Sequence, residues 1–247
     1  MKALCLAALL AASASAGHGA CRLALSLGLD VSGSVDAAEY RLQLDGIASA
    51  LETADVQAAL FEMPQANVSL SVFQWGGSQQ QQLLVDWTDV TTLDDLSFVT
   101  KQLRSATPTF DDPQTAIGAA IEFGLVVLAE KPECWMHTLD ISGDGPSSSG
   151  PAPLSVMLPD QPITTINGLV VNPNGRDNIT KDLTYSETLL DHYQTQVIRG
   201  PGAFVETAVD FHDFENAMTR KLTRELNVLL LSWQTPPHRT TAPQFPG

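Results

Sequence analysis

The stretch from Cys21 to Asp30, C-R-L-A-L-S-L-G-L-D, constrains the fold more than any other part of the chain. A mostly apolar run that ends in a carboxylate is typical of a strand buried on both faces of a parallel sheet. A helical pattern follows directly, because Asp36 and Glu39 resemble a capping box and apolar residues then recur at helical spacing, at Tyr40, Leu44, Ile47 and Leu51. A buried strand followed by an amphipathic helix predicts an α/β fold.

Strand and helix patterns alternate along the rest of the chain. Strands are predicted over residues 67–75, 83–87, 134–141, 163–171 and 203–209, and helices over residues 93–104, 115–130, 184–197 and 211–231. A glycine pair at Gly76 and Gly77 predicts a hairpin, whereas residues 172–177 predict a turn and residues 146–162 a loop. No repeat or shift in composition marks a second domain, so we predict one mostly parallel sheet covered by helices on both faces.

The N-terminal residues have the pattern of a secretory signal peptide, with Lys2, a short apolar run and then small residues through Ala20. Cleavage after Ala16 fits the small-x-small rule, and cleavage before Cys21 is the alternative, which would raise the question of a lipid anchor. No later stretch reaches the ~20 apolar residues that span a bilayer. We therefore expect a signal peptide over residues 1–20, a domain over 21–231, a Pro-rich disordered tail over 232–247, and a secreted or periplasmic location.

The negative charge of the chain argues against partners that are themselves polyanionic. The formal net charge is −15, and no cluster of Lys or Arg offsets it locally. Such a chain repels nucleic-acid phosphates and anionic lipid surfaces. The acidity serves either solubility alone or the attraction of cations to a few carboxylates, and the sequence leaves the oligomeric state open.

Two cysteines remain once the signal peptide is removed, and in an oxidising compartment they are expected to pair. Cys21 lies nine residues before Asp30, and Cys134 lies ten residues before Asp144. If the two strands are parallel neighbours, the cysteines meet at one end of the sheet and the carboxylates at the other. We therefore predict a disulfide between Cys21 and Cys134, the alternative being two unpaired buried thiols.

A set of oxygen-bearing residues follows the two most apolar strands. Asp30, Ser32 and Ser34 stand where the first strand gives way to the first helix, which is where open α/β sheets bind ligands. Asp144 follows the strand over residues 134–141, and Thr115 stands at the start of the buried helix. An all-oxygen set of this kind suits a hard cation such as Mg²⁺, with Mn²⁺ or Ca²⁺ as alternatives. Neutral hydroxyl ligands would leave the ion seeking an anionic oxygen from outside.

D-V-S-G-S at residues 30–34 resembles the D-x-S-x-S signature of von Willebrand factor A-like domains, and Thr115 and Asp144 fall where those domains place their other two metal-site motifs. The chain also resembles an uncharacterised group of secreted bacterial proteins, over residues 30–40, 114–118, 140–145, 165–169 and 200–205. The resemblance implies a doubly wound six-stranded sheet with strand order 3-2-1-4-5-6 and a metal-ion-dependent adhesion site. Pro113 and Gln114 replace the usual glycine pair, and Asp112 becomes a further candidate carboxylate.

Three functions fit these observations. The first is a divalent-metal-dependent adhesion module, not an enzyme, in which a protein partner's carboxylate completes the shell of the ion. The second is a metal-dependent hydrolase or phosphatase with Asp30 as nucleophile, against which Ser32 stands where a second acid is expected. The third is a metal-free interaction domain with a vestigial site, in which the same Asp and Ser residues only cap a helix.

Other polar residues carry weaker predictions. Asp140 lies within an apolar strand, where it either faces the site or hydrogen-bonds to neighbouring backbone. His137, His192 and His212 lack the paired spacing of a zinc site and are interpreted as solvated or structural. Trp75 and Trp87 flank the hairpin and are interpreted as packing residues.

Overall fold

The computed structural model describes residues 20–107, 114–171 and 189–234, with side chains as far as Asn227. Its central sheet has six strands in the order β3-β2-β1-β4-β5-β6, with only the β2–β3 pair antiparallel. The strands are β1 (Ala20–Asp30), β2 (Ala66–Trp75), β3 (Gln81–Val90), β4 (Met136–Gly143), β5 (Ile163–Val171) and β6 (Val205–Ala208). The predicted fold class and strand order are confirmed.

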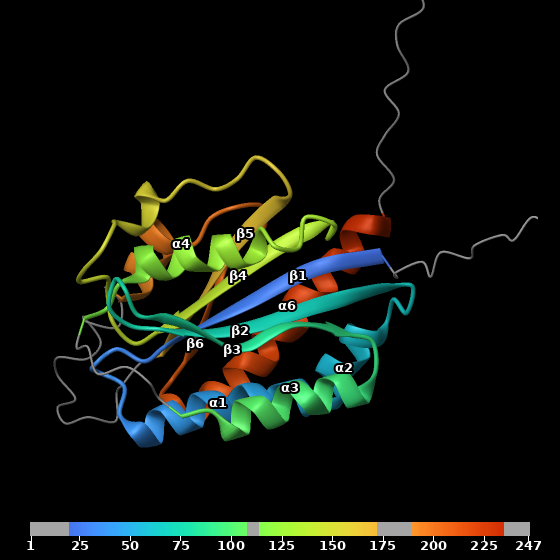
Figure 1. The fold of residues 1–247 in the computed structure, drawn as a ribbon, viewed down its shortest axis with the longest axis horizontal. Helices are drawn as coiled ribbons and strands as arrows, with labels where there is room; N and C mark the ends of the chain where they lie inside the picture. The colour runs from blue at the N-terminus through green and yellow to red at the C-terminus, as the bar shows by residue number, and fades with distance from the viewer. Residues whose placement is uncertain (1–19, 108–113, 172–188, 235–247) are drawn as a thin grey trace, which may run out of the picture.

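Helices cover both faces of this sheet (Figure 1). One face packs against α1 (Ala37–Glu52), α2 (Ala54–Phe61), α3 (Leu93–Ser105) and α6 (Phe214–Gln234), and the other packs against α4 (Ile117–Leu128). Short elements complete the fold: η1 (Pro153–Ser155), the π-helical turn η2 (Tyr193–Val197) and η3 (Phe211–Asp213). No helix in the described ranges is both long and apolar enough to cross a membrane.

The alternation of side chains along β1 builds two separate cores. Leu23, Leu25, Leu27 and Leu29 face α1 and α6, whereas Cys21 and Ala24 face the α4 side. Gly28 also faces the α4 side, where a Cβ atom would lie 2.6 Å from Cζ of Phe73. Because β1 is buried along almost its whole length, its carboxyl end is held in a fixed position between β2 and β4.

A disulfide joins Cys21 to Cys134, with 4.5 Å between their Cα atoms. It ties the start of β1 to the residues just before β4, and the register between these strands pairs Leu23 with Met136. The predicted pairing is therefore present, at the end of the sheet opposite Asp30 and Asp144.

Several element boundaries differ from the sequence prediction. Helix α2 was not predicted, because its eight residues follow α1 after only Thr53 and show no separate apolar stripe. Helix α4 begins at Ile117 rather than at residue 115, because the backbone N–H of Ala116 donates to the carbonyl of Gly76 (2.9 Å) in the β2–β3 turn. The predicted helix over 184–197 ends in the π-helical turn η2, and the turn over 172–177 lies outside the described residues.

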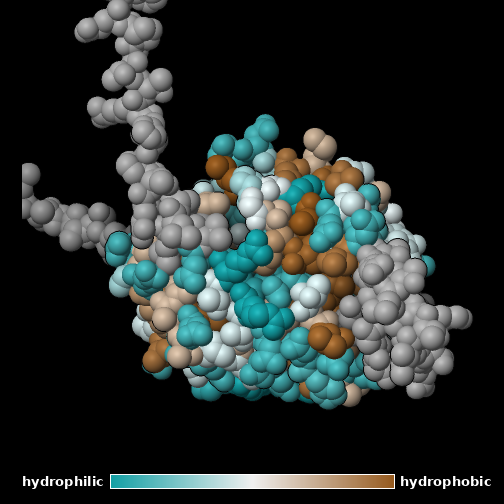
Figure 2. All heavy atoms as spheres, turned by 180° about the vertical axis from the view of Figure 1, so that it is seen from behind, coloured by the Kyte–Doolittle hydropathy of each residue, from teal (hydrophilic) through white to brown (hydrophobic). Residues whose placement is uncertain are grey.

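The surface on the side opposite the view of Figure 1 carries both hydrophilic and hydrophobic residues. Hydrophilic residues dominate it, and hydrophobic residues form separate patches (Figure 2). The exposed large apolar side chains are distributed over α3, α4, η1, β5 and two loop positions, at Leu93, Phe98, Val126, Leu154, Met157, Ile163 and Val209.

Candidate metal centre

The carboxyl ends of β1 and β4 bring the predicted site together. Asp30 is the last residue of β1 and is 1% exposed, and its Oδ1 accepts a hydrogen bond from the backbone N–H of Ser32 (2.7 Å). The Asp30 carbonyl accepts a second hydrogen bond from Nε2 of Gln43 in α1 (3.0 Å). These bonds turn the chain sharply after the strand, so that the Ser32 side chain lies on the same side as the carboxylate.

Hydroxyl groups connect the three remote segments in one continuous chain of contacts. Thr115 Oγ1 donates to Ser32 Oγ (3.2 Å), and Ser32 Oγ lies 3.3 Å from Ser34 Oγ. Ser34 Oγ then donates to Oδ1 of Asp144 (2.6 Å). The structure thus places the oxygen atoms of all five predicted ligands next to one another, although the chain separates Ser34 from Asp144 by 110 residues.

The Asp30 carboxyl group is in an unfavourable environment for its charge. Burial, and then repulsion by the nearby Asp144, raise its pKa to about 7, against opposing hydrogen bonds from the backbone and side chain of Ser32 and from the backbone of Asp144. Among the described residues nothing donates a hydrogen bond to Oδ2 of Asp30, although this atom is fully buried. A buried carboxylate oxygen without a donor, beside a second carboxylate and three hydroxyl groups, fits the ligand chemistry of a hard divalent cation.

Backbone contacts hold Thr115 in this arrangement. The Thr115 N–H donates to Ser148 Oγ (3.0 Å), and the Ser148 N–H donates back to the Thr115 carbonyl (2.8 Å). Ser148 belongs to the loop after β4, so the same loop that carries Asp144 also fixes Thr115. The sequence analysis missed Ser148 because a serine in a Pro- and Ser-rich loop has no distinguishing pattern. The additional candidate, Asp112, lies outside the described residues.

Gly143 is a second residue that the sequence analysis did not single out. A Cβ atom at this position would lie 2.4 Å from the Tyr193 hydroxyl oxygen and 3.0 Å from Oδ2 of Asp30. The close approach of Tyr193, which is fully buried in η2, therefore requires glycine immediately before Asp144. The only advance signal was the glycine on either side of Asp144 in the S-G-D-G sequence.

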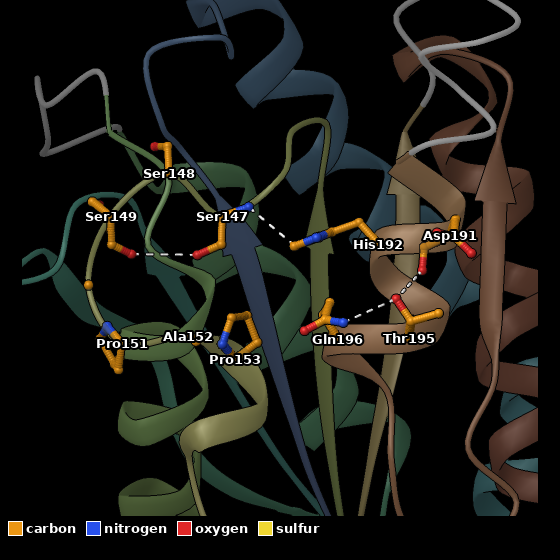
Figure 3. A pocket seen from close by; sticks show the side chains of 11 residues that line it. Ser147, Ser148, Ser149, Pro151, Ala152, Pro153, Asp191, His192, Thr195 and Gln196 are labelled. Atoms are coloured by element: carbon orange, nitrogen blue, oxygen red, sulfur yellow. Dashed lines mark hydrogen bonds between the residues drawn. The ribbon is translucent and has the colours of Figure 1, made fainter.

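A polar pocket of about 600 Å³ adjoins this centre (Figure 3). Its walls come from the loop after β4, which includes Ser147 and Ser148, and from the helical segment that carries Asp191 and His192. The Ser147 N–H donates to Nε2 of His192 (3.3 Å), and burial lowers the pKa of His192. The described lining residues include Asp191 but no Lys or Arg. None of the five candidate ligands lines the pocket, but Ser148, which does, holds Thr115 and so connects the pocket with the candidate metal site.

Asp140 and His137 make structural contacts away from the candidate metal ligands. The prediction for Asp140 was wrong in both alternatives, because its side chain points to the α6 side and contacts Lys221 rather than the site or the backbone. His137 is buried and its Nε2 lies 2.9 Å from the Lys131 carbonyl. Within the ranges that the structure describes, no group of three or more His, Cys, Asp and Glu residues could hold a metal. The candidate site contains only two side chains of these types, Asp30 and Asp144, because its other three candidate ligands are hydroxyl groups.

This fold and the three converging segments are similar to those of von Willebrand factor A-like domains. Solved structures with the same fold include proximal thread matrix protein 1 from the mussel byssus (14% identity, 84% of this chain and 48% of that chain, TM-score 0.54). They also include a D319A mutant of the PilB minor pilin from Streptococcus sanguinis (11% identity, 88% of this chain and 65% of that chain, TM-score 0.55). The chain belongs to the family described as "Protein of unknown function (DUF1194)", whose model matches residues 20–230.

A further solved structure of the mussel protein has a zinc-occupied MIDAS motif, the metal-ion-dependent adhesion site (12% identity, 84% of this chain and 46% of that chain, TM-score 0.53). This chain thus spans about half the length of the mussel protein and 65% of the pilin. No curated protein sequence matches the chain.

Proposed function

We propose that the protein is an exported adhesion-type binding module in which a divalent cation captures an acidic group of a protein partner. Asp30, Ser32, Ser34, Thr115 and Asp144 would hold the ion. The single observation that carries the proposal is the buried Oδ2 of Asp30, which has no donor among the described residues and lies beside the hydroxyl chain that leads to Asp144. A cation bound there would neutralise the two carboxylates that now repel each other.

The ligand set also explains why the ion would bind a partner. Only Asp30 and Asp144 carry charge, and the other three groups are neutral hydroxyls. A hard cation bound by so few anionic oxygens remains a strong acceptor for one more carboxylate. Mg²⁺ suits such all-oxygen ligands best, with Mn²⁺ or Ca²⁺ as alternatives. The zinc-occupied MIDAS of the mussel protein supports a divalent cation in this fold.

The surroundings of the site favour a polar partner segment. The adjoining pocket presents hydroxyl and amide groups from Ser147, Thr195 and Gln196, and one carboxylate from Asp191. A peptide whose acidic residue binds the ion could place a neighbouring polar or basic residue in this pocket. The export that this role requires rests on the signal-like residues at the N-terminus, which lie outside the described part of the chain.

Calorimetric titration with Mg²⁺ and Mn²⁺ tests the proposal. The wild type is expected to bind one ion, and Asp30→Ala is expected to abolish the heat of binding. Asp160→Ala is the matched control, because Asp160 is an exposed carboxylate in the loop before β5 and removing it changes the net charge equally. Absence of metal binding in the wild type, with partner capture unchanged by chelator, would instead establish a metal-free interaction domain.

A further inference from the structure

A buried cluster of ionisable side chains lies between the sheet and α6. Asp140 projects from β4, and Lys221 and Glu225 project from α6. Their exposed fractions are 3%, 0% and 6%, respectively. The Lys221 Nζ atom contacts both Oδ1 of Asp140 and Oε1 of Glu225. The cluster is separate from the metal centre, because its side chains lie on the α6 face of β4.

Neighbouring residues hold these groups in place, and a narrow pocket of about 40 Å³ reaches Asn167, Phe204 and Glu225. Asn167 on β5 donates from Nδ2 to Oε1 of Glu225 (2.7 Å) and accepts the backbone N–H of Phe204 at Oδ1 (3.0 Å). The Phe204 ring lies 5.3 Å from the Lys221 Nζ atom and covers it. The Lys221 amine is therefore held beneath the Phe204 ring, against the Asp140 carboxyl group of β4 and the Glu225 carboxyl group of α6.

The cluster is poorly satisfied as a simple ion pair. Apart from the contacts among its own three members, no donor in the described part of the chain satisfies the carboxyl oxygens of Asp140 or Oε2 of Glu225. A buried ion pair offsets the cost of removing both charges from water only when further hydrogen bonds satisfy its oxygens. Converting the two opposite charges into one neutral amide would remove that cost.

A proton carrier is also present. Burial, followed by repulsion from Asp140, raises the pKa of Glu225 to about 8, so this carboxyl group holds a proton at neutral pH. Glu225 lies in contact with the amine and near the Asp140 carboxyl group. An amine, a carboxyl group and a carboxylic acid that can pass protons between them are the reactants that an amide condensation requires.

We propose that Lys221 and Asp140 form an intramolecular isopeptide bond, with Glu225 transferring the protons. The ammonium of Lys221 first gives a proton to Asp140, which leaves a neutral amine beside a carboxylic acid. The Nζ–Cγ bond forms and a Cγ–Oδ bond breaks. Glu225 donates its proton to the departing oxygen and takes one from the nitrogen, so one water molecule leaves and no oxidant or reductant is needed. The product covalently joins β4 to α6.

Peptide mapping of the full-length protein tests this bond directly. After reduction, alkylation and trypsin digestion, the unmodified chain should give a fragment over residues 105–176, because Lys131 precedes a proline. Cleavage after Arg220 and after Lys221 should release residues 222–224 as a separate peptide. The isopeptide bond blocks cleavage at Lys221. We expect residues 221–224 attached to residues 105–176, with a mass lower than the sum of the two by about 18 Da, one water molecule. Unlinked fragments in the wild type would overturn the proposal.

Substitutions identify the atoms involved. Lys221→Arg keeps the positive charge but cannot form this amide, so fragment 105–176 should appear alone. Asp140→Asn should give the same link with a loss of about 17 Da, because ammonia leaves instead of water. Glu225→Gln should lose the link, and a Glu225→Gln chain that keeps it would overturn the role assigned to Glu225. A link from residues 221–224 to residues 225–239 would place the amide on Glu225 and overturn the assignment to Asp140.

Discussion

Removing the Cys21–Cys134 disulfide is expected to lower the stability of the domain strongly without changing its affinity for metal. The proposed perturbation is the double substitution Cys21→Ala with Cys134→Ala, because a single substitution would leave a reactive thiol. The disulfide closes a loop with a sequence separation of 113 residues. Loop-closure entropy for that length corresponds to about 5 kcal/mol at 25 °C.

Removing the sulfur atoms makes a second, smaller contribution to the expected loss of unfolding free energy. Both cysteines are buried, with exposed fractions of 6% and 2%, so replacing their sulfur atoms adds on the order of 1 kcal/mol of lost apolar contact. A total of about 6 kcal/mol is a large part of the 5–15 kcal/mol that stabilises a typical domain. The denatured chain also expands when the cross-link is removed, so the denaturant dependence of the unfolding free energy should become steeper.

Urea unfolding at neutral pH, followed by circular dichroism and tryptophan fluorescence, measures both effects. The oxidised wild type, the reduced wild type and the double alanine variant should be compared, and the alanine variant should be less stable than the reduced wild type by about 1 kcal/mol, since only it lacks the sulfur atoms. Mg²⁺ affinity should be the same in all three, because the disulfide and Asp30 lie at opposite ends of β1. A loss below about 2 kcal/mol with no change in the denaturant dependence would refute the loop-entropy reasoning.

Three further predictions follow from the site. Asp30→Asn should stabilise the metal-free protein at pH 8 but not at pH 4. Because the pKa of Asp30 in the folded state is raised to about 7, the wild type loses stability as pH rises from about 4 to 7, by up to about 4 kcal/mol. Urea unfolding at both pH values measures this difference. Gly143→Ala should destabilise by about 1–3 kcal/mol, measured by thermal unfolding, because its Cβ meets the Tyr193 hydroxyl. Ser148→Ala should weaken Mg²⁺ binding several-fold in calorimetry while Ser155→Ala does not, because the Ser148 hydroxyl accepts the Thr115 N–H whereas the Ser155 hydroxyl donates to the Ala152 carbonyl.

The sequence predicted the centre of the fold better than its periphery. The buried run that ends at Asp30 could be read directly, since a strand covered on both faces needs apolar residues throughout. The family resemblance implied that β1 and β4 are neighbours, and the similar spacing from each cysteine to its carboxylate agreed with that pairing, because parallel neighbours advance together along the chain. Helix α2 could not be distinguished from the end of α1, since it depends on packing against α6 and not on its own pattern.

Contacts between distant polar residues were the hardest to predict. Asp140 could not be assigned a partner, because nothing in the pattern of α6 marks Lys221 as an inward-pointing residue. Thr115 was placed at the start of a helix, although its position depends on Ser148 and on the turn at Gly76. In each case the residue type could be read from the sequence, and only the folded structure supplied the partner.

The outer edge of β3 has a consequence for behaviour at high concentration. β3 is the edge strand of the sheet on the β2 side, and within the described ranges no strand pairs with its free side. Asp86 is exposed there, and the Asp89 carboxylate is paired with Lys131 (3.1 Å). Charges on an edge strand oppose the addition of a further strand from another molecule. A domain with this edge can reach high concentration without its sheet adding a strand from the sheet of another molecule.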